Sequence, residues 1–87
     1  MFDFDPAKSA ANKAKHGIDF EEAQALWLDA NRLELPSRDG GTEERWLVIG
    51  RIDAKLWTAV VTYRQSATRL ISCRRARRDE ERLYDED

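Results

Sequence analysis

Residues 44–74 decide the fold of this chain, because three runs typical of β-strands follow one another there with only short turns between them. The runs are ERWLVIGRI (44–52), LWTAVVTYR (56–64) and TRLISCR (68–74), and the turns are DAK (53–55) and QSA (65–67). Valine, isoleucine, threonine and aromatic residues favour strands, and short connections favour pairing between neighbours. We therefore expect three consecutive antiparallel strands in the middle of a small sheet.

The two faces of this expected sheet differ in composition. Pairing centred on the two turns places odd-numbered positions on one largely apolar face: Leu47, Ile49, Trp57, Ala59, Val61, Tyr63, Ile71 and Cys73. The even-numbered positions are mixed: Trp46, Val48, Thr58, Val60, Thr62, Arg64, Leu70, Ser72 and Arg74. The first face suits a core beneath helices. The hydroxyl groups and arginines of the second face suit a ligand surface, unless the last helix simply covers it.

The N-terminal segment predicts a helix with well-marked ends. Asp5 is suited to the N-cap, Pro6 to the first helical position, and Gly17 to the position after the last turn. The helix between them, Pro6 to His16, carries small residues at helical spacing on a narrow face: Ala7, Ala10, Ala11 and Ala14.

A second helix follows directly. Asp19 with Glu22 three residues later has the spacing of a capping box, which predicts a helix start. The apolar residues after it recur at helical spacing: Phe20, Ala23, Leu26 and Trp27. Residues 29–31 are expected to end this helix.

Shorter elements flank the three central strands. Residues 32–35 alternate as a strand would, with Pro36 expected to stop them, and residues 37–42 form a loop. Ala76 to Tyr84 is expected to be a short helix whose acidic residues oppose the helix dipole, so that its end frays.

Length and composition exclude several classes of protein. A chain of 87 residues allows one small domain, spanning residues 1–87. It has no apolar run near the ~18 residues of a membrane helix, and its start lacks the features of a signal peptide. The single cysteine, Cys73, excludes an internal disulfide, and with His16 as the single histidine there is no zinc cluster. We expect a soluble cytoplasmic protein without cofactor or metal.

The charges are distributed unevenly along the chain. The formal net charge is −2, but residues 45–78 hold nine basic residues and one acid. Residues 79–87 hold six acids and one base. Local potential, rather than the total, steers a charged partner, and arginine suits phosphate groups. The basic block therefore predicts a polyanion-binding surface, with the alternative that its arginines pair with the acidic tail.

This set of residues suits metal-free cleavage of RNA. No glycine-rich phosphate loop is present, and Cys73 falls on the expected core face, away from a nucleophilic role. In RNA the 2′-hydroxyl can attack the adjacent phosphate, so the protein need only orient the backbone, move protons and neutralise charge. His16 is the natural proton carrier, although a histidine at a helix C-terminus is also explained by the dipole.

Several motifs resemble the BrnT family, the toxins of type II toxin–antitoxin systems. They include Phe4-Asp5-Pro6-x-Lys8, Asn12-x-x-Lys15-His16-Gly17-Ile18-x-Phe20-Glu21-Glu22-Ala23, Glu44-Arg45, Gly50, Tyr63-Arg64, Ile71-Ser72-x-Arg74-x-Ala76-x-Arg78-x-Glu80, and Tyr84. The resemblance covers nearly the whole chain. It implies an α+β, RelE-like fold: two N-terminal helices, an antiparallel sheet of about four strands, and a short C-terminal helix.

The same resemblance implies a function and partners. The function would be a ribonuclease that cleaves RNA by 2′-hydroxyl transesterification and inhibits translation and growth. A BrnA-type antitoxin would neutralise it and would alone contact operator DNA. The alternative from the residues themselves is a non-catalytic module that binds nucleic acid or protein, such as an inactive relative of the toxins.

The matched positions supply the candidate site residues. Arg64 and Arg74 are expected to contact the scissile or neighbouring phosphates, and His16 to act as acid or base; these three are the catalytic candidates. The expected RNA-binding residues are Lys15, Arg45, Arg78 and Tyr84. Tyr84 has an alternative role as a pin that fixes the last helix to the sheet.

Overall fold

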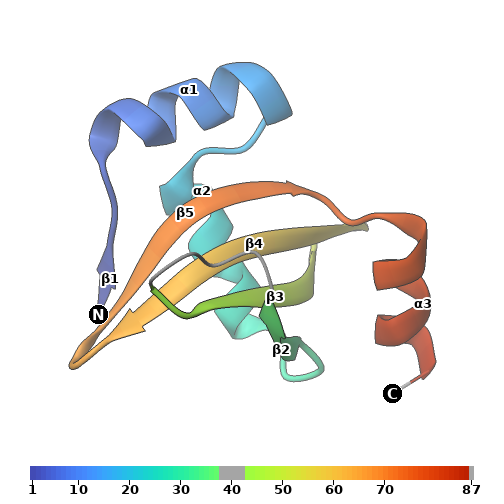
Figure 1. Ribbon diagram of the computed structural model, residues 1–87. Helices are drawn as coiled ribbons and strands as arrows, with labels where there is room; N and C mark the ends of the chain where they lie inside the picture. Colours follow the sequence, from blue (N-terminus) through green and yellow to red (C-terminus); the bar gives the residue numbers. More distant parts are fainter. Residues whose placement is uncertain (38–42, 87) are drawn as a thin grey trace.

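Five strands form one mixed sheet in the order β1-β5-β4-β3-β2 (Figure 1). The computed structural model describes residues 1–37 and 43–86, so the expected loop at 37–42 lies, beyond Ser37, outside the described residues. The strands are β1 Phe2–Asp3, β2 Leu33–Ser37, β3 Arg45–Ile52, β4 Lys55–Arg64 and β5 Ala67–Arg75. The helices are α1 Pro6–His16, α2 Phe20–Ala23, the 3-10 helix η1 Gln24–Leu28, and α3 Arg78–Glu86. None of the described helices is long and apolar enough to cross a membrane.

The central antiparallel strands are confirmed, but the sheet has features that the sequence analysis missed. β3, β4 and β5 pair antiparallel in sequence order. The two-residue β1 adds a parallel strand beside β5, so the sheet is not purely antiparallel. The expected stop at Pro36 is wrong, because β2 continues to Ser37 and Pro36 pairs with Trp46. β2 is an edge strand, where a missing N–H is tolerated.

The expected division of the sheet into odd and even positions is wrong for β3. Ile52 pairs with Lys55, so the turn holds two residues, with Asp53 in the left-handed region at φ 55°. The expected turn held three residues. Moving the pairing by one residue exchanges the faces of a strand. Trp46 and Val48 therefore face the helices, whereas Leu47 and Ile49 face away.

A bulge in the pairing of β4 with β5 exchanges the two faces of β5 partway along the strand. The register shifts between Val60 and Val61, so Val61 pairs with Leu70 while Ala59 pairs with Cys73. Leu70 and Cys73 therefore both face the helices, and Ile71 is the additional residue. The prediction was correct for Cys73 and for β4, and wrong for Leu70 and Ile71.

The main hydrophobic core lies between the sheet and the N-terminal helices. Its buried members are Ile18, Phe20, Ala23, Leu26, Val48, Trp57, Ala59, Val61, Leu70 and Cys73. Burial raises the pKa of the Cys73 thiol to about 12, which leaves it protonated and unreactive. The expectation that Cys73 belongs to the core is therefore confirmed.

Helix α1 contacts this core through polar residues rather than through its alanines. The ends are as expected: Asp5 accepts a hydrogen bond from Ala7 N, and Gly17 is left-handed at φ 84°. The four alanines are exposed, whereas Ser9 and Asn12 are buried. The amide of Asn12 donates to Cys73 O at 2.8 Å and accepts from Cys73 N at 3.3 Å. The side chain thus pairs with the edge of β5 as a neighbouring strand would.

The second and last helices differ from expectation in their extent. The capping box of Asp19 with Glu22 is present, but α2 has four residues and continues as the 3-10 helix η1. Helix α3 begins at Arg78 rather than Ala76, which places Asp79, Glu80 and Glu81 in its first turn. Acidic side chains at this end interact favourably with the helix dipole, so the expectation that they oppose it is wrong for this turn.

Candidate functional site

The face of the sheet opposite α1 and α2 gathers arginines from three strands, and we call it the arginine face. Its pairing register arranges the side chains in three rows across the sheet. The first row is Leu33, Ile49, Thr58 and Arg74; the second is Leu35, Leu47, Val60 and Ser72; the third is Ser37, Arg45, Thr62 and Arg69. Arg64 follows Thr62 on the same face of β4. The arginines therefore lie on both sides of the largely apolar second row.

At the first row, Arg74 and Glu80 form the best-buried ion pair of the described residues. Arg74 Nη1 and Nη2 donate to the two carboxylate oxygens at 2.7 and 2.9 Å. Thr58 Oγ1 donates to the same carboxylate at 2.9 Å, and so does Arg77 N at 2.8 Å. The Glu80 side chain is 8% exposed. Glu80 therefore joins the start of α3 to β4 and β5.

This network keeps the Glu80 carboxylate ionised. Burial alone would raise the pKa of Glu80, but the hydrogen bonds from Arg74, Arg77 N and Thr58 outweigh it and hold that pKa at about 2. A carboxylate with so low a pKa is a weak base at neutral pH. Glu80 is thus suited to holding Arg74 rather than to accepting a proton.

A cleft of about 410 Å³ lies on the arginine face between α3 and β2. Its lining residues are Ser37, Arg45, Leu47, Val60, Arg74, Arg77, Asp79 and Glu80. The volume is within the range of pockets that hold small molecules. Leu47 and Val60 provide its apolar part, and its charged lining combines three guanidinium groups with the carboxylates of Asp79 and Glu80.

The arginines at the other end of the face pair with exposed acids. Arg64 donates to both oxygens of Glu43 at 3.0 and 3.1 Å, and Arg69 donates to Asp3 at 2.7 Å. The hydrogen bond from Arg64 lowers the pKa of Glu43, and the charges of Arg45 and Arg69 lower it further. About half of the Arg64 and Glu43 side chains is exposed, so this pair is weak and accessible to competing anions.

Two buried polar atoms on this face have no hydrogen-bond partner among the residues that the structure describes. They are Arg45 Nε and Thr62 Oγ1, and Thr62 is 0% exposed. The pairing of Trp46 with Val61 places Arg45 directly opposite Thr62. Among the described residues, Arg45 has no ion-pair partner. Orphaned polar atoms of this kind call for a water or a ligand, since buried polar groups are normally satisfied.

The catalytic candidates are not brought together. Arg64 and Arg74 share the arginine face, but each already pairs with a carboxylate. His16 ends α1 on the helix-covered side of the sheet, and it makes no hydrogen bond or ion pair with a described residue. The structure thus separates the predicted proton carrier from the predicted phosphate ligands.

The four RNA-binding candidates are likewise divided. Arg45 lines the cleft. Lys15 is exposed beside His16, and Arg78 is exposed at the first residue of α3. Tyr84 donates its hydroxyl to Asp29 at 2.7 Å, and Arg51 lies over its ring at 5.6 Å. Tyr84 therefore has the contacts of a pin for α3.

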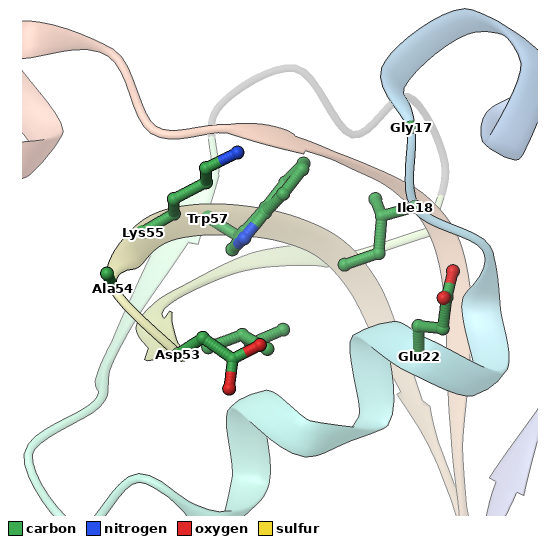
Figure 2. Close-up of a pocket in the computed structure, with 8 residues that line it drawn as sticks. Gly17, Ile18, Glu22, Asp53, Ala54, Lys55 and Trp57 are labelled. Atoms are coloured by element: carbon green, nitrogen blue, oxygen red, sulfur yellow. The ribbon is translucent and has the colours of Figure 1, made fainter.

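A second cavity, of about 300 Å³, lies on the other side of the molecule between the Gly17–Ile18 segment and the β3–β4 turn. Figure 2 shows the Trp57 ring between the side chains of Lys55 and Ile18. Carboxylates of Glu22 and Asp53 also line it, so its charges are mixed. None of the seven candidate residues lines this cavity.

The sequence analysis missed as site residues Arg77 and Glu80, which line the cleft, and Thr58, which donates a hydrogen bond to Glu80. The position of Glu80 three residues after Arg77 is a capping spacing, and it could have indicated where α3 starts. Nothing in the sequence links Glu80 to Thr58, because that contact depends on how α3 folds back on the sheet.

Comparison with known proteins gives the family. The chain matches, over residues 4–80, the family model described as "Ribonuclease toxin, BrnT, of type II toxin-antitoxin system". No curated protein matches the chain. Antitoxins of type II systems are proteins, which makes a protein antitoxin the partner. Because this match spans most of its length, the chain belongs to the BrnT family of ribonuclease toxins.

Proposed function

We propose that this protein cleaves single-stranded RNA on the arginine face without a metal ion and thereby inhibits translation and growth. The observation that carries the proposal is the cleft lined by Arg45, Arg74 and Arg77 beside Leu47 and Val60, where three guanidinium groups outnumber the carboxylates of Asp79 and Glu80. The described residues contain no group of three His, Cys, Asp or Glu side chains placed to hold a metal. A BrnA-type antitoxin is proposed to neutralise the toxin and to make the contacts with operator DNA.

Arg74 can contact a phosphate while Glu80 holds it. A guanidinium has five N–H donors. Three of them are used, two by Glu80 and one by Arg75 O at 3.3 Å. The Nε–H and one Nη2–H remain, and Arg74 Nε is not among the buried orphaned atoms. These two donors form one edge of the planar fork and suit two oxygens of a phosphate.

The proposed reaction is transesterification. The 2′-oxygen of the RNA forms a bond to phosphorus, the bond from phosphorus to the 5′-oxygen breaks, and a 2′,3′-cyclic phosphate results. The arginines stabilise the negative charge that develops on the phosphate oxygens. Because the chain's one histidine lies on the other side of the sheet, we propose that water accepts the 2′-hydroxyl proton and protonates the leaving 5′-oxygen.

The test is cleavage of an unstructured RNA by the purified protein in EDTA, with identification of the product ends. We expect cyclic or 3′-phosphate ends, and a loss of at least tenfold in rate for Arg74→Ala and for Arg45→Ala. Arg51→Ala is the matched control, because Arg51 is exposed and stacks on Tyr84 outside the cleft. Tight RNA binding without any product would refute the ribonuclease proposal.

A second candidate function is a non-catalytic module that binds RNA or protein. The observation that favours it is the engagement of Arg64 and Arg74 by carboxylates, together with the separation of His16. Growth after induced expression separates the two functions. Arrest that Arg74→Ala relieves supports the ribonuclease, and the absence of arrest supports the module.

A further inference from the structure

The cleft on the arginine face contains a carboxylate that the described residues leave unpaired. Asp79 and Glu80 both line the cleft. Glu80 accepts hydrogen bonds at both oxygens from Arg74, and Thr58 and Arg77 N donate to it as well. Asp79 is exposed and makes no hydrogen bond or ion pair with any described residue. Because a free carboxylate repels phosphate, it suits the hydrogen-bond donors of a base instead.

The position of Asp79 in helix α3 does not by itself explain why it lines the cleft. Asp79, Glu80 and Glu81 all lie in the first turn of α3, where acidic side chains interact favourably with the helix dipole. Glu81 provides this benefit without lining the cleft. The helix therefore does not need a carboxylate on the cleft side at this position.

Asp79 lies close to the arginine that is proposed to contact a phosphate. The hydrogen bond to Glu80 is the main cause that raises the pKa of Arg74, and the charges of Glu80 and Asp79 raise that pKa further. Interactions between charges weaken with distance and are screened by water, so the Asp79 carboxylate lies beside the Arg74 guanidinium. A base held by Asp79 would therefore belong to a nucleotide next to the phosphate at Arg74.

The cleft also provides a free guanidinium near this carboxylate. Arg77 precedes Asp79 by two residues and lines the same cleft. Its backbone N–H is used by Glu80, but its exposed side chain makes no hydrogen bond or ion pair with a described residue. A charged donor and a charged acceptor are thus both available to one ligand.

Guanine is the base whose polar groups match this pair. Its O6 and N7 are neighbouring acceptors that suit the two donors of an arginine. Its N1–H and its N2 amino group are neighbouring donors that suit the two oxygens of a carboxylate. Adenine, cytosine and uracil each have a single donor group on the corresponding edge, so they satisfy the carboxylate less completely.

The size and apolar part of the cleft suit one unpaired base. Its volume is about 410 Å³, and Leu47 and Val60 provide an aliphatic surface for the ring. In a duplex the N1–H and N2 groups of guanine are already paired with cytosine. Only a single strand can present this edge to a protein side chain.

We propose that Asp79 and Arg77 make the cleft selective for guanine, with the Asp79 carboxylate accepting hydrogen bonds from N1–H and the N2 amino group, and Arg77 donating to O6 and N7. The guanine lies against Leu47 and Val60, beside the phosphate at Arg74. This selectivity rests on the proposed function for RNA as the polymer, and it specifies the substrate as single-stranded RNA with guanine at the bound position.

The test measures the affinity of 2′-O-methyl pentanucleotides UUXUU by fluorescence anisotropy, with guanine, hypoxanthine, adenine, cytosine or uracil at X. The blocked 2′-oxygen prevents cleavage. For the wild-type protein we expect guanine to bind about tenfold more tightly than each of the others, as one bidentate contact allows. Hypoxanthine is the sharpest comparison, because it differs from guanine only by lacking the N2 amino group.

Asp79→Asn should remove the preference while leaving the protein folded. Guanine and hypoxanthine should then bind within about twofold of each other, although every oligonucleotide binds somewhat more tightly because a negative charge is lost. Glu81→Gln is the matched control, since it removes the same charge from the same helical turn outside the cleft. It should keep the wild-type preference for guanine.

The contribution of Arg77 is tested with 7-deazaguanine, in which a C–H group replaces N7. The wild-type protein should bind it about tenfold less tightly than guanine, and Arg77→Gln should bind the two equally. Equal affinity in the wild type would overturn the role given to Arg77.

Several results would overturn the selectivity itself. They are equal binding of guanine and hypoxanthine by the wild type, tighter binding of another base, and a preference that survives in Asp79→Asn. Loss of the preference in Glu81→Gln would also overturn it, because the stability of α3 rather than a contact with the base would then decide the affinity.

The two proposals can fail separately. If the wild-type protein prefers guanine but cuts no RNA, the ribonuclease proposal fails and the selectivity stands. If RNA is cut but the preference is absent, the selectivity alone fails. A melting curve for each variant confirms that it is folded.

Discussion

The two faces of the sheet differ in their main role: the helix-covered face stabilises the fold, and the arginine face is the candidate binding surface. The helix-covered face holds the cluster of ten buried residues. Among the described residues, α3 covers part of the arginine face, where Glu80 forms a buried ionic network with Arg74 and Thr58. Apolar packing tolerates little change in volume, whereas exposed charged groups contribute little to folding. Substitutions in the buried cluster should therefore affect stability, and those of exposed charged groups on the arginine face should affect RNA binding.

The largest effect on stability is expected from Phe20→Ala. Phe20 is 1% exposed and packs edge-on against Phe4 at 5.7 Å between ring centres. Loss of a buried phenylalanine lowers the free energy of unfolding by about 3–5 kcal/mol. Domains of this kind have only about 5–15 kcal/mol in total. Urea unfolding measures the loss.

Leu28→Ala is the matched control for that prediction, because Leu28 is 86% exposed on the neighbouring helix η1. Its effect should stay within about 0.5 kcal/mol. Equal losses in both variants would contradict the division between a packed face and an open surface.

The next largest effect concerns Glu80 and pH. The pKa of Glu80 is about 2 in the folded protein, against the ordinary value of 4.5. Because the folded value is lower, the stabilisation is complete above pH 4.5 and is lost as the pH falls toward 2. The shift corresponds to about 3 kcal/mol.

Unfolding measured between pH 6 and pH 2 tests this linkage. In Glu80→Gln that part of the pH dependence should be missing, while Glu86→Gln, an exposed site on the same helix, should keep it. A Glu80→Gln variant with the wild-type pH dependence would show that other carboxylates carry it.

Local rules predicted much of the fold, and non-local pairing explains the errors. The caps at Asp5 and Asp19 follow from neighbouring residues, and the structure confirms both. The register of β3 depends on one residue of turn length, which Asp53 decides by adopting a left-handed backbone. β1 has two residues and so carries no pattern to detect.

The sequence predicted the kinds of residues in the site but not the ion pairs that they form. Alternation along the strands indicated that Arg64 and Arg74 share a face. The carboxylates that pair with these arginines lie outside the strands: Glu43 precedes β3, and Glu80 is in α3. Only the tertiary fold determines those ion pairs. The motif that contains His16 carried no information about which side of the sheet α1 covers.

A smaller effect is expected at Asn12, which fixes the edge of β5 on the helix-covered side. Its amide donates to Ile18 O and Cys73 O, both at 2.8 Å. Asn12→Ala would leave these buried groups unsatisfied and lower the free energy of unfolding by about 1–2 kcal/mol. Hydrogen exchange at the Cys73 amide should accelerate as well.

Lys8→Ala, an exposed substitution on the same helix, should change neither quantity measured for Asn12→Ala. Loss of stability without faster exchange at Cys73 would place the role of Asn12 at the α1–α2 connection, through Ile18 O, instead of at the strand edge.

The smallest effect is expected at His16, and it tests the division of the two faces most directly. His16 lies at the C-terminus of α1, away from the cleft, so His16→Gln should leave RNA cleavage within twofold of the wild type. The loss of its interaction with the helix dipole should lower stability by less than about 1 kcal/mol. Arg74→Ala, measured beside it, should abolish cleavage. A tenfold loss of cleavage in His16→Gln would mean that the RNA passes around the edge of the sheet to the helix-covered side, and that both faces share the catalytic work.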